Sequence, residues 1–235
     1  GQINLRDANR RTIEFTNPDG KVYRLKAEPA VLIARVRGLH LSEKHVGWSG
    51  GERIPGCLFD FGLYFFHNYQ ARRANGAGVY YYVPKIQSHE EAAWWDSVFT
   101  YTEQRFSVPV GTIKATFLIE TLPAAFQMDE ILYALRNHAV ALNCGRWDYI
   151  FSYIKTLRKH ADRVLPDRQA LTMDKPFLSA YSRLLIRTCH RRGALAMGGM
   201  AAFIPSKDPQ QNELVAAKVL ADKTLEARDG HDGTW

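Results

Sequence analysis

The chain has 235 residues, of which 46% are hydrophobic, and it carries a formal net charge of +7. This is enough to bury a sizeable core, and no apolar run approaches the length of a membrane span. Its three widely spaced cysteines argue against a disulfide framework and indicate a reducing compartment, so we expect a cytoplasmic protein. Basic residues are scattered among acidic ones. We therefore expect no nucleic-acid or membrane partner, although a polyphosphate ligand would suit the positive excess.

The first third of the chain reads as short strands followed by a helix. Residues 1–30 are polar, and two alternating runs around Asn17-Pro18-Asp19-Gly20 predict a β-hairpin. An apolar run at 31–36 predicts a buried strand that ends in basic residues. Residues 40–55 read as a long loop, which indicates a functional segment or a cover over a site. Residues 57–74 predict a densely apolar helix.

Strands and helices then alternate to the end of the chain. Ser88, followed by Glu91 three positions later, forms a capping box that opens a helix. Outside the central stretch, the expected elements are a strand at 79–86, helices at 88–106, 176–191 and 210–228, and a small-residue strand at 194–200.

The central stretch, 112–151, reads as strand, helix, strand, helix. The first strand stops at Glu120, a helix spans about 121–138, the second strand is closed by Gly145, and a new helix begins near Trp147. A crossover helix makes the two strands parallel, so Glu120 and Asp148 lie beyond the same ends. Neighbouring strands lie about 5 Å apart, and two carboxylates there suit Mg²⁺. The alternative is that both acids only favour helix starts.

Five sheet strands are expected in this alternating α/β pattern, at 31–36, 79–84, 113–119, 139–143 and 194–199. Polar residues follow the carboxyl ends of several strands rather than a single switch point. This spread favours a TIM (β/α)₈ barrel over an open doubly wound sheet. A barrel needs eight strands and about 250 residues. We therefore expect an incomplete barrel, with 31–235 as its central part and 1–30 leading into it.

Long specific segments carry a family resemblance. The segments at 34–46, 56–68, 112–132, 136–151 and 189–205 together resemble malate synthase of the shorter A type. The likeness covers nearly the whole chain, although Ala141 stands where the family usually has glycine. The resemblance implies a barrel with additional domains. It also implies a glyoxylate-cycle enzyme that condenses acetyl-CoA with glyoxylate and hydrolyses the thioester to malate and CoA.

The resemblance also implies roles for individual residues. Glu120 and Asp148 match the Mg²⁺ ligands, and Arg35 matches the arginine that stabilises the enolate oxygen. Arg37 competes for that role, because residues two apart on a strand share a face. Substrate binding is expected at Gly145, Trp147, Asp148, Phe203 and Pro205, with the last two along the pantetheine arm.

The family's general base is an aspartate that would lie downstream of Trp235. We therefore expect no general base in this chain and no appreciable activity from these 235 residues alone. Two alternatives remain open. One is a related Mg²⁺-dependent lyase acting on malyl-CoA or citramalyl-CoA, and the other is a non-catalytic chain that binds Mg²⁺ or CoA. Cys144, beside the expected metal site, is interpreted as a buried packing residue.

Overall fold

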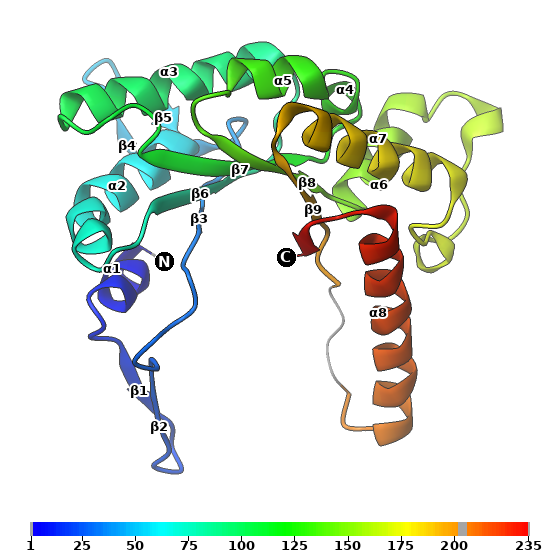
Figure 1. Cartoon of the computed structure of the whole chain (residues 1–235), viewed down its shortest axis with the longest axis horizontal. Coiled ribbons are helices and arrows are strands. Elements are labelled where there is room, and N and C mark those ends of the chain that lie inside the picture. The colour runs from blue at the N-terminus through cyan, green and yellow to red at the C-terminus, as the bar shows by residue number, and fades with distance from the viewer. Residues whose placement is uncertain (1, 202–205, 235) are drawn as a thin grey trace. The chain divides into compact units, whose positions relative to one another are not determined.

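A computed structural model describes residues 2–201 and 206–234 (Figure 1). The chain divides into two compact units. One consists of Gly1–Pro84 with Phe99–Ala115, and the other of Lys85–Val98 with Thr116–Trp235. No helix among the described residues is long and apolar enough to cross a membrane.

The main sheet contains six strands in the order β10-β9-β8-β7-β6-β3. Their bounds are β3 (Ala34–Arg35), β6 (Val79–Val83), β7 (Ile113–Ile119), β8 (Ala139–Cys144), β9 (Leu195–Gly198) and β10 (Gly233–Thr234). The pairs β3–β6, β8–β9 and β9–β10 are parallel, as expected for strands joined by crossover helices. All five predicted strands are present, but β3 is shorter than predicted and β10 was not foreseen. Within the described residues, the sheet has fewer strands than a closed barrel.

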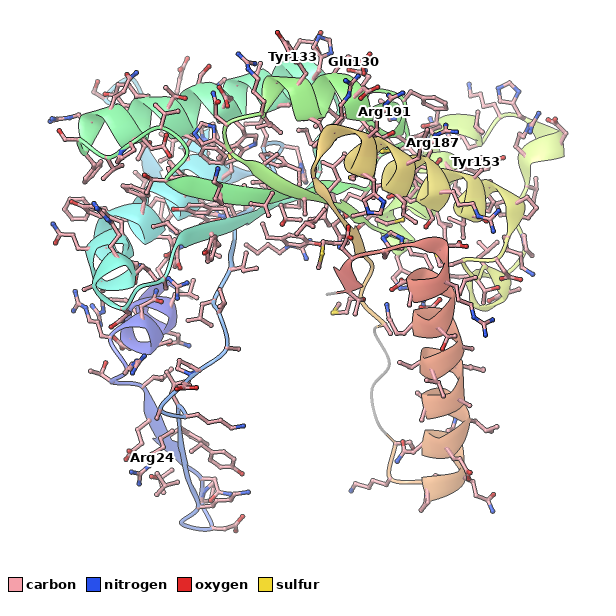
Figure 2. The ribbon with its side chains drawn as sticks, viewed as in Figure 1. Arg24, Glu130, Tyr133, Tyr153, Arg187 and Arg191 are labelled. Carbon is pink, nitrogen blue, oxygen red and sulfur yellow. The ribbon has the colours of Figure 1, made fainter. Side chains whose placement is uncertain are left out.

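The first unit begins with helix α1 (Gln2–Asn9), which the sequence analysis missed, and the predicted hairpin. Strands β1 (Glu14–Thr16) and β2 (Val22–Arg24) pair antiparallel, and Figure 2 shows Arg24 on this ribbon. The Asn17 side chain accepts a hydrogen bond from the Lys21 amide at 2.8 Å, and Gly20 takes a left-handed φ of 81°. The structure therefore confirms the hairpin that the turn sequence predicted.

The expectation of one long loop over 40–55 was wrong. Strands β4 (Ser42–Gly47) and β5 (Arg53–Pro55) pair antiparallel there. The Trp48 amide donates to the Glu52 carbonyl at 2.8 Å, and Gly51 takes a left-handed φ of 82°. This hairpin is largely exposed, so its strands lack the apolar alternation that marks a half-buried strand.

Aromatic side chains form the core of the first unit. Helix α2 (Gly56–Ala74) presents Phe61 and Tyr64 to Tyr81 of β6, and the ring centroids are 4.9 and 5.4 Å apart. Phe99, in the second half of α3 (His89–Arg105), lies 5.3 Å from Phe61. These rings are at most 3% exposed, and burying each contributes roughly 2–3 kcal/mol.

The single helix predicted over 121–138 was also wrong, because two short helices take its place. Helix α4 (Leu122–Ala125) ends at Phe126, and α5 (Met128–Ala134) begins after Gln127. The amides of Phe126 and Gln127 bond three residues back, to Pro123 and Ala124, which tightens and ends the first helix. Gln127 then accepts a hydrogen bond from the His89 amide at 3.1 Å. A tertiary contact thus supports the break.

The second unit also contains three longer helices that match their predictions closely. They are α6 (Trp147–Leu157), α7 (Pro176–Arg192) and α8 (Pro209–Asp229), and the segment between α6 and α7 includes short 3₁₀ turns at Ala161–Arg163 and Arg168–Ala170. Leu142 of β8, Leu185 of α7 and Ile131 of α5 are completely buried. These side chains give the unit its own apolar core.

All three cysteines are free, as predicted, and buried; burial had been predicted for Cys144 alone. Burial raises the pKa of Cys144 to about 12 and that of Cys57 to about 11. A thiol with so high a pKa holds almost no thiolate near neutral pH, so Cys144 serves packing rather than nucleophilic chemistry.

Candidate active site

Two carboxylates meet beyond the carboxyl ends of the neighbouring strands β7 and β8. Glu120 directly follows β7, and Asp148 lies in the first turn of α6. The Lys85 ammonium joins them, with Nζ 3.1 Å from Glu120 Oε1 and 2.9 Å from Asp148 Oδ2. Glu120 is not the cap of the next helix, since Thr121 holds that position. The alternative that Glu120 starts the next helix is therefore wrong, whereas Asp148 does lie in the first turn of α6.

The environment of Glu120 disfavours its charge. Its side chain is 2% exposed, and burial is the main cause that raises the pKa of its carboxyl group. The hydrogen bond and negative charge of Asp148 raise it further, while Lys85 lowers it. Two acids held this close in a partly buried place are stabilised by a cation.

Neighbouring side chains hold the turn after Glu120 in place. The Thr121 hydroxyl donates to the Ile86 carbonyl at 2.8 Å, and the Leu122 amide donates to Ser152 Oγ at 2.9 Å. The first bond ties the end of β7 to the segment that follows Lys85, and the second ties it to α6. Both acid-bearing segments and the lysine are thus connected through short polar contacts.

Gly145 allows β8 to end close to Glu120. A Cβ atom added at Gly145 would lie 2.9 Å from the Cβ of Glu120 and 3.6 Å from its Oε2. Real Cβ atoms do not approach other carbon atoms so closely, so glycine is required by space at this position. The predicted site residue Gly145 therefore lies against the acid, where its lack of a side chain sets the separation.

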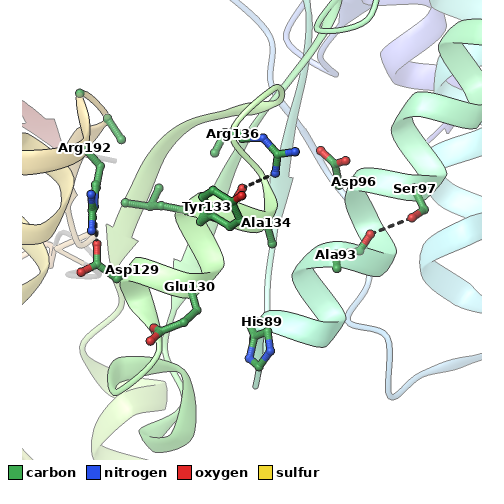
Figure 3. A pocket seen from close by; sticks show the side chains of 14 residues that line it. His89, Ala93, Asp96, Ser97, Asp129, Glu130, Tyr133, Ala134, Arg136 and Arg192 are labelled. Carbon is green, nitrogen blue, oxygen red and sulfur yellow. Dashed lines mark hydrogen bonds and ion pairs between the residues drawn. The ribbon is translucent and has the colours of Figure 1, made fainter.

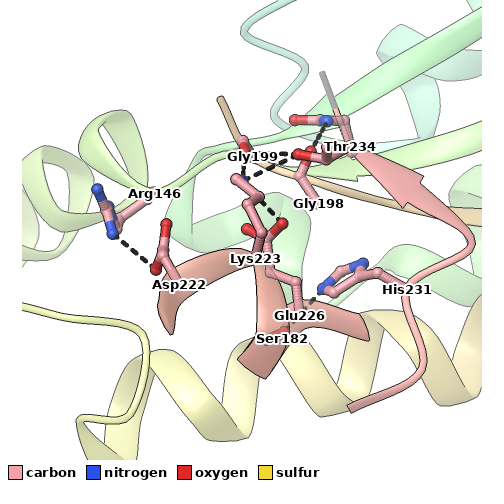
Figure 4. A network of polar contacts seen from close by, with 10 residues as sticks. Arg146, Ser182, Gly198, Gly199, Asp222, Lys223, Glu226, His231 and Thr234 are labelled. Atoms are coloured by element: carbon pink, nitrogen blue, oxygen red, sulfur yellow. Dashed lines mark hydrogen bonds and ion pairs between the residues drawn. The ribbon is translucent and has the colours of Figure 1, made fainter. Parts of the chain in front are cut away.

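Trp147 opens α6 between two cationic side chains. The Arg146 guanidinium lies 4.4 Å from the Trp147 ring centroid, and that of Arg168 lies 5.3 Å away. Arg146 also pairs with Asp222 of α8 at 3.2 Å (Figure 4). The N-cap residue Arg146 makes no side-chain hydrogen bond to the first turn of α6, and uncapped amides at a helix start can bind an anion.

A second polar network secures the adjacent strands β9 and β10 (Figure 4). Lys223 donates to Glu226 at 2.8 Å and to Thr234 Oγ1 at 2.9 Å, and it also bonds the Gly199 carbonyl. Ser182 bonds His231 at 3.0 Å, and burial lowers the pKa of that histidine. Lys223 and Thr234 both bond the Gly199 carbonyl, so this part of the network supports the short strand β10.

The two candidate arginines, Arg35 and Arg37, belong to the first unit and have different surroundings. Arg35 is exposed at the end of β3, in register with Tyr82 of β6, and its guanidinium lies 5.4 Å from that ring. Arg37 is held by Asp60 at 2.9 Å and by Glu43 at 2.7 Å, with its backbone amide also donating to Asp60. Arg37 is thus committed to internal ion pairs, while Arg35 presents its guanidinium to solvent.

The predicted substrate residues Phe203 and Pro205 lie outside the described residues. Lys85 was not singled out as a site residue, although it was recognisable as a polar residue directly after a buried strand, as Glu120 is. The sequence pattern could not show that the Lys85 side chain reaches both Glu120 and Asp148.

A sizeable cavity in the second unit lies elsewhere. It has a volume of about 880 Å³ and is lined by residues of α3, α5 and the end of α7 (Figure 3). Ala139 and Ala194 place it at the amino ends of β8 and β9, opposite the acids. Asp129 pairs there with Arg192 at 2.7 Å, which lowers the pKa of Asp129, and Arg136 bonds the Tyr133 carbonyl. Barrel enzymes place their chemistry at the carboxyl ends, so we assign the candidate site to the acids.

The donor set of the pair fits a hard divalent cation. Carboxylate oxygens are the ligands that Mg²⁺ prefers, with waters and substrate oxygens completing six positions. Within the described part of the chain, no group of three or more histidine, cysteine, aspartate or glutamate side chains gathers as a metal cage. Glu120 and Asp148 could thus contribute two ligands to such a cation, and small molecules would have to supply the others.

Comparisons with known proteins agree with this geometry. The family profile described as "Malate synthase, TIM barrel domain" matches residues 31–235. The chain belongs to the malate synthase family. Its relatives include malate synthase A of Escherichia coli (strain K12), at 73% identity over 235 residues, and the malate synthase of Myxococcus xanthus (strain DK1622), at 60% over 236. A glyoxysomal malate synthase of Gossypium hirsutum is 54% identical over 240 residues.

Each of these alignments covers 100% of this chain but only 42–44% of the malate synthase relative. The chain therefore spans less than half the length of the curated malate synthases that it matches. Among solved structures, a citrate lyase of Burkholderia xenovorans LB400 aligns with a TM-score of 0.55 at 20% identity, covering 76% of this chain and 49% of the other. A Haloferax volcanii malate synthase gives 0.50 at 17% identity, covering 72% and 46%. The expected fold class, an incomplete TIM barrel, is confirmed.

We predict that Gly145→Ala destabilises the protein by roughly 1–3 kcal/mol, because the new Cβ forces Glu120 and the end of β8 apart. Urea unfolding followed by circular dichroism measures this change. Gly62→Ala is the matched control. Gly62 lies on α2 with no atom within 4 Å of an added Cβ, so alanine should leave stability unchanged or raise it by up to about 1 kcal/mol. Equal stability changes for the two variants would contradict the close-approach argument.

Proposed function

We propose that this chain carries the metal and glyoxylate site of a Mg²⁺-dependent malate synthase. In the full reaction, acetyl-CoA and glyoxylate condense, and hydrolysis of the thioester yields malate and CoA. The observation that carries the proposal is the convergence of Glu120 and Asp148 at the carboxyl ends of β7 and β8. The family membership supports it, because homologues at 60–73% identity are named malate synthase.

Glu120 and Asp148 would hold the Mg²⁺ ion in this proposal. When bound, the ion supplies Lewis-acid chemistry that polarises an aldehyde carbonyl. The protein's own contribution is to keep the acids close before any ligand arrives. Thr121, Ser152 and the space left by Gly145 perform that task.

Arg35 is proposed to stabilise the enolate oxygen of acetyl-CoA. Removal of a methyl proton leaves negative charge on the thioester oxygen, and a guanidinium remains cationic at every working pH. Arg35 lies at the carboxyl end of β3 with an exposed side chain. We prefer Arg35 to Arg37 for this role because Asp60 and Glu43 engage the Nε and Nη2 atoms of Arg37.

C–C bond formation and thioester hydrolysis are proposed to follow enolate formation. The enolate carbon attacks the aldehyde carbon of glyoxylate, which forms the new C–C bond, and water then cleaves the thioester to release CoA. The first amides of α6, at Trp147 and Asp148, are proposed to hold the glyoxylate carboxylate. Phe203 and Pro205 are proposed to line the pantetheine arm. The base that accepts the methyl proton is proposed to lie outside this chain.

CoA release from acetyl-CoA in the presence of glyoxylate and Mg²⁺ tests this division of labour. We expect a protein extended to the length of the malate synthase relatives to release CoA, and this 235-residue chain to be at least about 100-fold slower because it lacks the base. A thiol-reactive dye follows the released CoA, and omission of glyoxylate controls for simple thioester hydrolysis. Comparable rates from the two proteins would place a base within residues 1–235.

The metal assignment predicts separate effects for the two acids. Glu120→Gln and Asp148→Asn should each lower Mg²⁺ affinity by at least about tenfold, because each removes an anionic ligand. Isothermal titration calorimetry measures the affinity, and circular dichroism checks that the fold persists. Glu130→Gln, at an exposed position on α5, is the matched control. Unchanged Mg²⁺ binding by folded Glu120→Gln protein would exclude the assignment.

The role of Arg35 predicts a kinetic signature in the extended protein. Arg35→Lys should lower kcat by about 100- to 1000-fold with little change in the KM for glyoxylate, because the enolate exists only after proton removal. Arg37→Lys should instead lower thermal stability, since the bidentate contacts to Asp60 are lost. Steady-state kinetics and thermal melting separate the two. A pure KM effect in Arg35→Lys would count against the enolate role.

A further inference from the structure

We propose that Lys85 is a positioning residue that acts as a built-in counter-cation for the Glu120–Asp148 pair, and that a divalent metal must displace its ammonium. This inference rests on the proposed metal site and goes beyond it, because it assigns a task to a residue that is not itself a ligand. It names Lys85 as the group that keeps the pair assembled and that competes with the metal for its oxygens.

The contacts of Lys85 make it a bridge rather than a surface lysine. Its Nζ lies 3.1 Å from Glu120 Oε1 and 2.9 Å from Asp148 Oδ2, within ion-pair distance of both. Glu120 is 2% exposed, Asp148 is 46% exposed, and the lysine side chain is 30% exposed. One ammonium thus spans a buried and a more open carboxylate, which offsets their mutual repulsion.

The backbone of Lys85 performs a second, separable task. Its amide donates to Glu120 Oε1 at 2.8 Å, so the same oxygen accepts bonds from the amide and from the ammonium. Lys85 adopts a left-handed φ of 64°, a conformation that is unfavourable for a residue with a side chain. Lys85 lies between Pro84 and Ile86, and the Ile86 carbonyl accepts the hydrogen bond from Thr121. This backbone conformation directs both the amide and the ammonium of Lys85 at Glu120.

Competition follows from the chemistry of the shared oxygens. A Mg²⁺ ion needs lone pairs of Glu120 and Asp148 that the ammonium now engages. The amide cannot leave without unfolding the turn, whereas the ammonium sits on a flexible four-carbon stem that reaches solvent. The metal would therefore displace the ammonium and leave in place the hydrogen bond from the Lys85 amide that orients Glu120. The acids stay close in both states, so metal binding needs little rearrangement of the backbone.

The test is isothermal titration of this chain with Mg²⁺. Lys85→Gln removes the competing cation, so it should bind Mg²⁺ about five- to tenfold more tightly than the unaltered chain. Lys85→Arg keeps a cation and should remain within about twofold. Lys85→Asn supplies a second neutral variant that tolerates a left-handed φ, in case glutamine does not fold there. Lys155→Gln, at an exposed position on α6, is the matched control and should change nothing.

Thermal melting gives an independent readout that does not depend on catalysis. Without metal, Lys85→Gln and Lys85→Asn should melt below the unaltered chain, because the acids repel each other. Added Mg²⁺ should raise their melting temperatures more than it raises that of the unaltered chain. Affinity that is unchanged or weaker in both neutral variants would overturn the proposal. If Glu120→Gln also bound Mg²⁺ normally, the metal site itself would fail; if it bound weakly, only the role of Lys85 would fall.

Discussion

The repulsion between Glu120 and Asp148 is the constraint around which the second unit is organised. Two carboxylates at neighbouring strand ends destabilise a fold unless positive charge, hydrogen bonds or a metal offset them. The protein supplies Lys85 as that charge, and the side chains of Thr121 and Ser152 hold the turn that follows the first acid. The arrangement that we propose for a divalent ion would be unfavourable without a cation such as the Lys85 ammonium.

Short-range geometry then decides how precisely the site is held. Gly145 ends β8 without a side chain, which lets the strand approach Glu120 more closely than any other residue would allow. The uncapped start of α6 follows within two residues and brings Asp148 with it. A parallel sheet brings Glu120 and Asp148 to one edge. The cavity at the opposite edge has polar groups that pair among themselves. The volume of this cavity is therefore not a sufficient reason to choose it as the candidate site.

Much of the fold and half of the site could be predicted because both depend on local patterns. Apolar periodicity located the main helices, and turn chemistry located the β1–β2 hairpin. The polar hairpin β4–β5 and the break between α4 and α5 were missed. The first has no apolar alternation, and the second is supported by the bond between Gln127 and His89, which are far apart in the chain. Local sequence carries no signal for such a contact.

The sequence by itself determined the family, the parallel α/β class and the two acids, because strand ends and family segments are written in consecutive residues. Only the tertiary structure showed which arginine is held in internal ion pairs and which side chain joins the two acids. Arg35 and Arg37 were expected to share a strand face, but β3 ends at Arg35, and folding brings Asp60 and Glu43 onto Arg37. Lys85 is 35 positions before Glu120, and the parallel pairing of distant strands brings their ends together. Long-range ion pairs of this kind have no sequence pattern, because they depend on chain segments that meet only in the folded state.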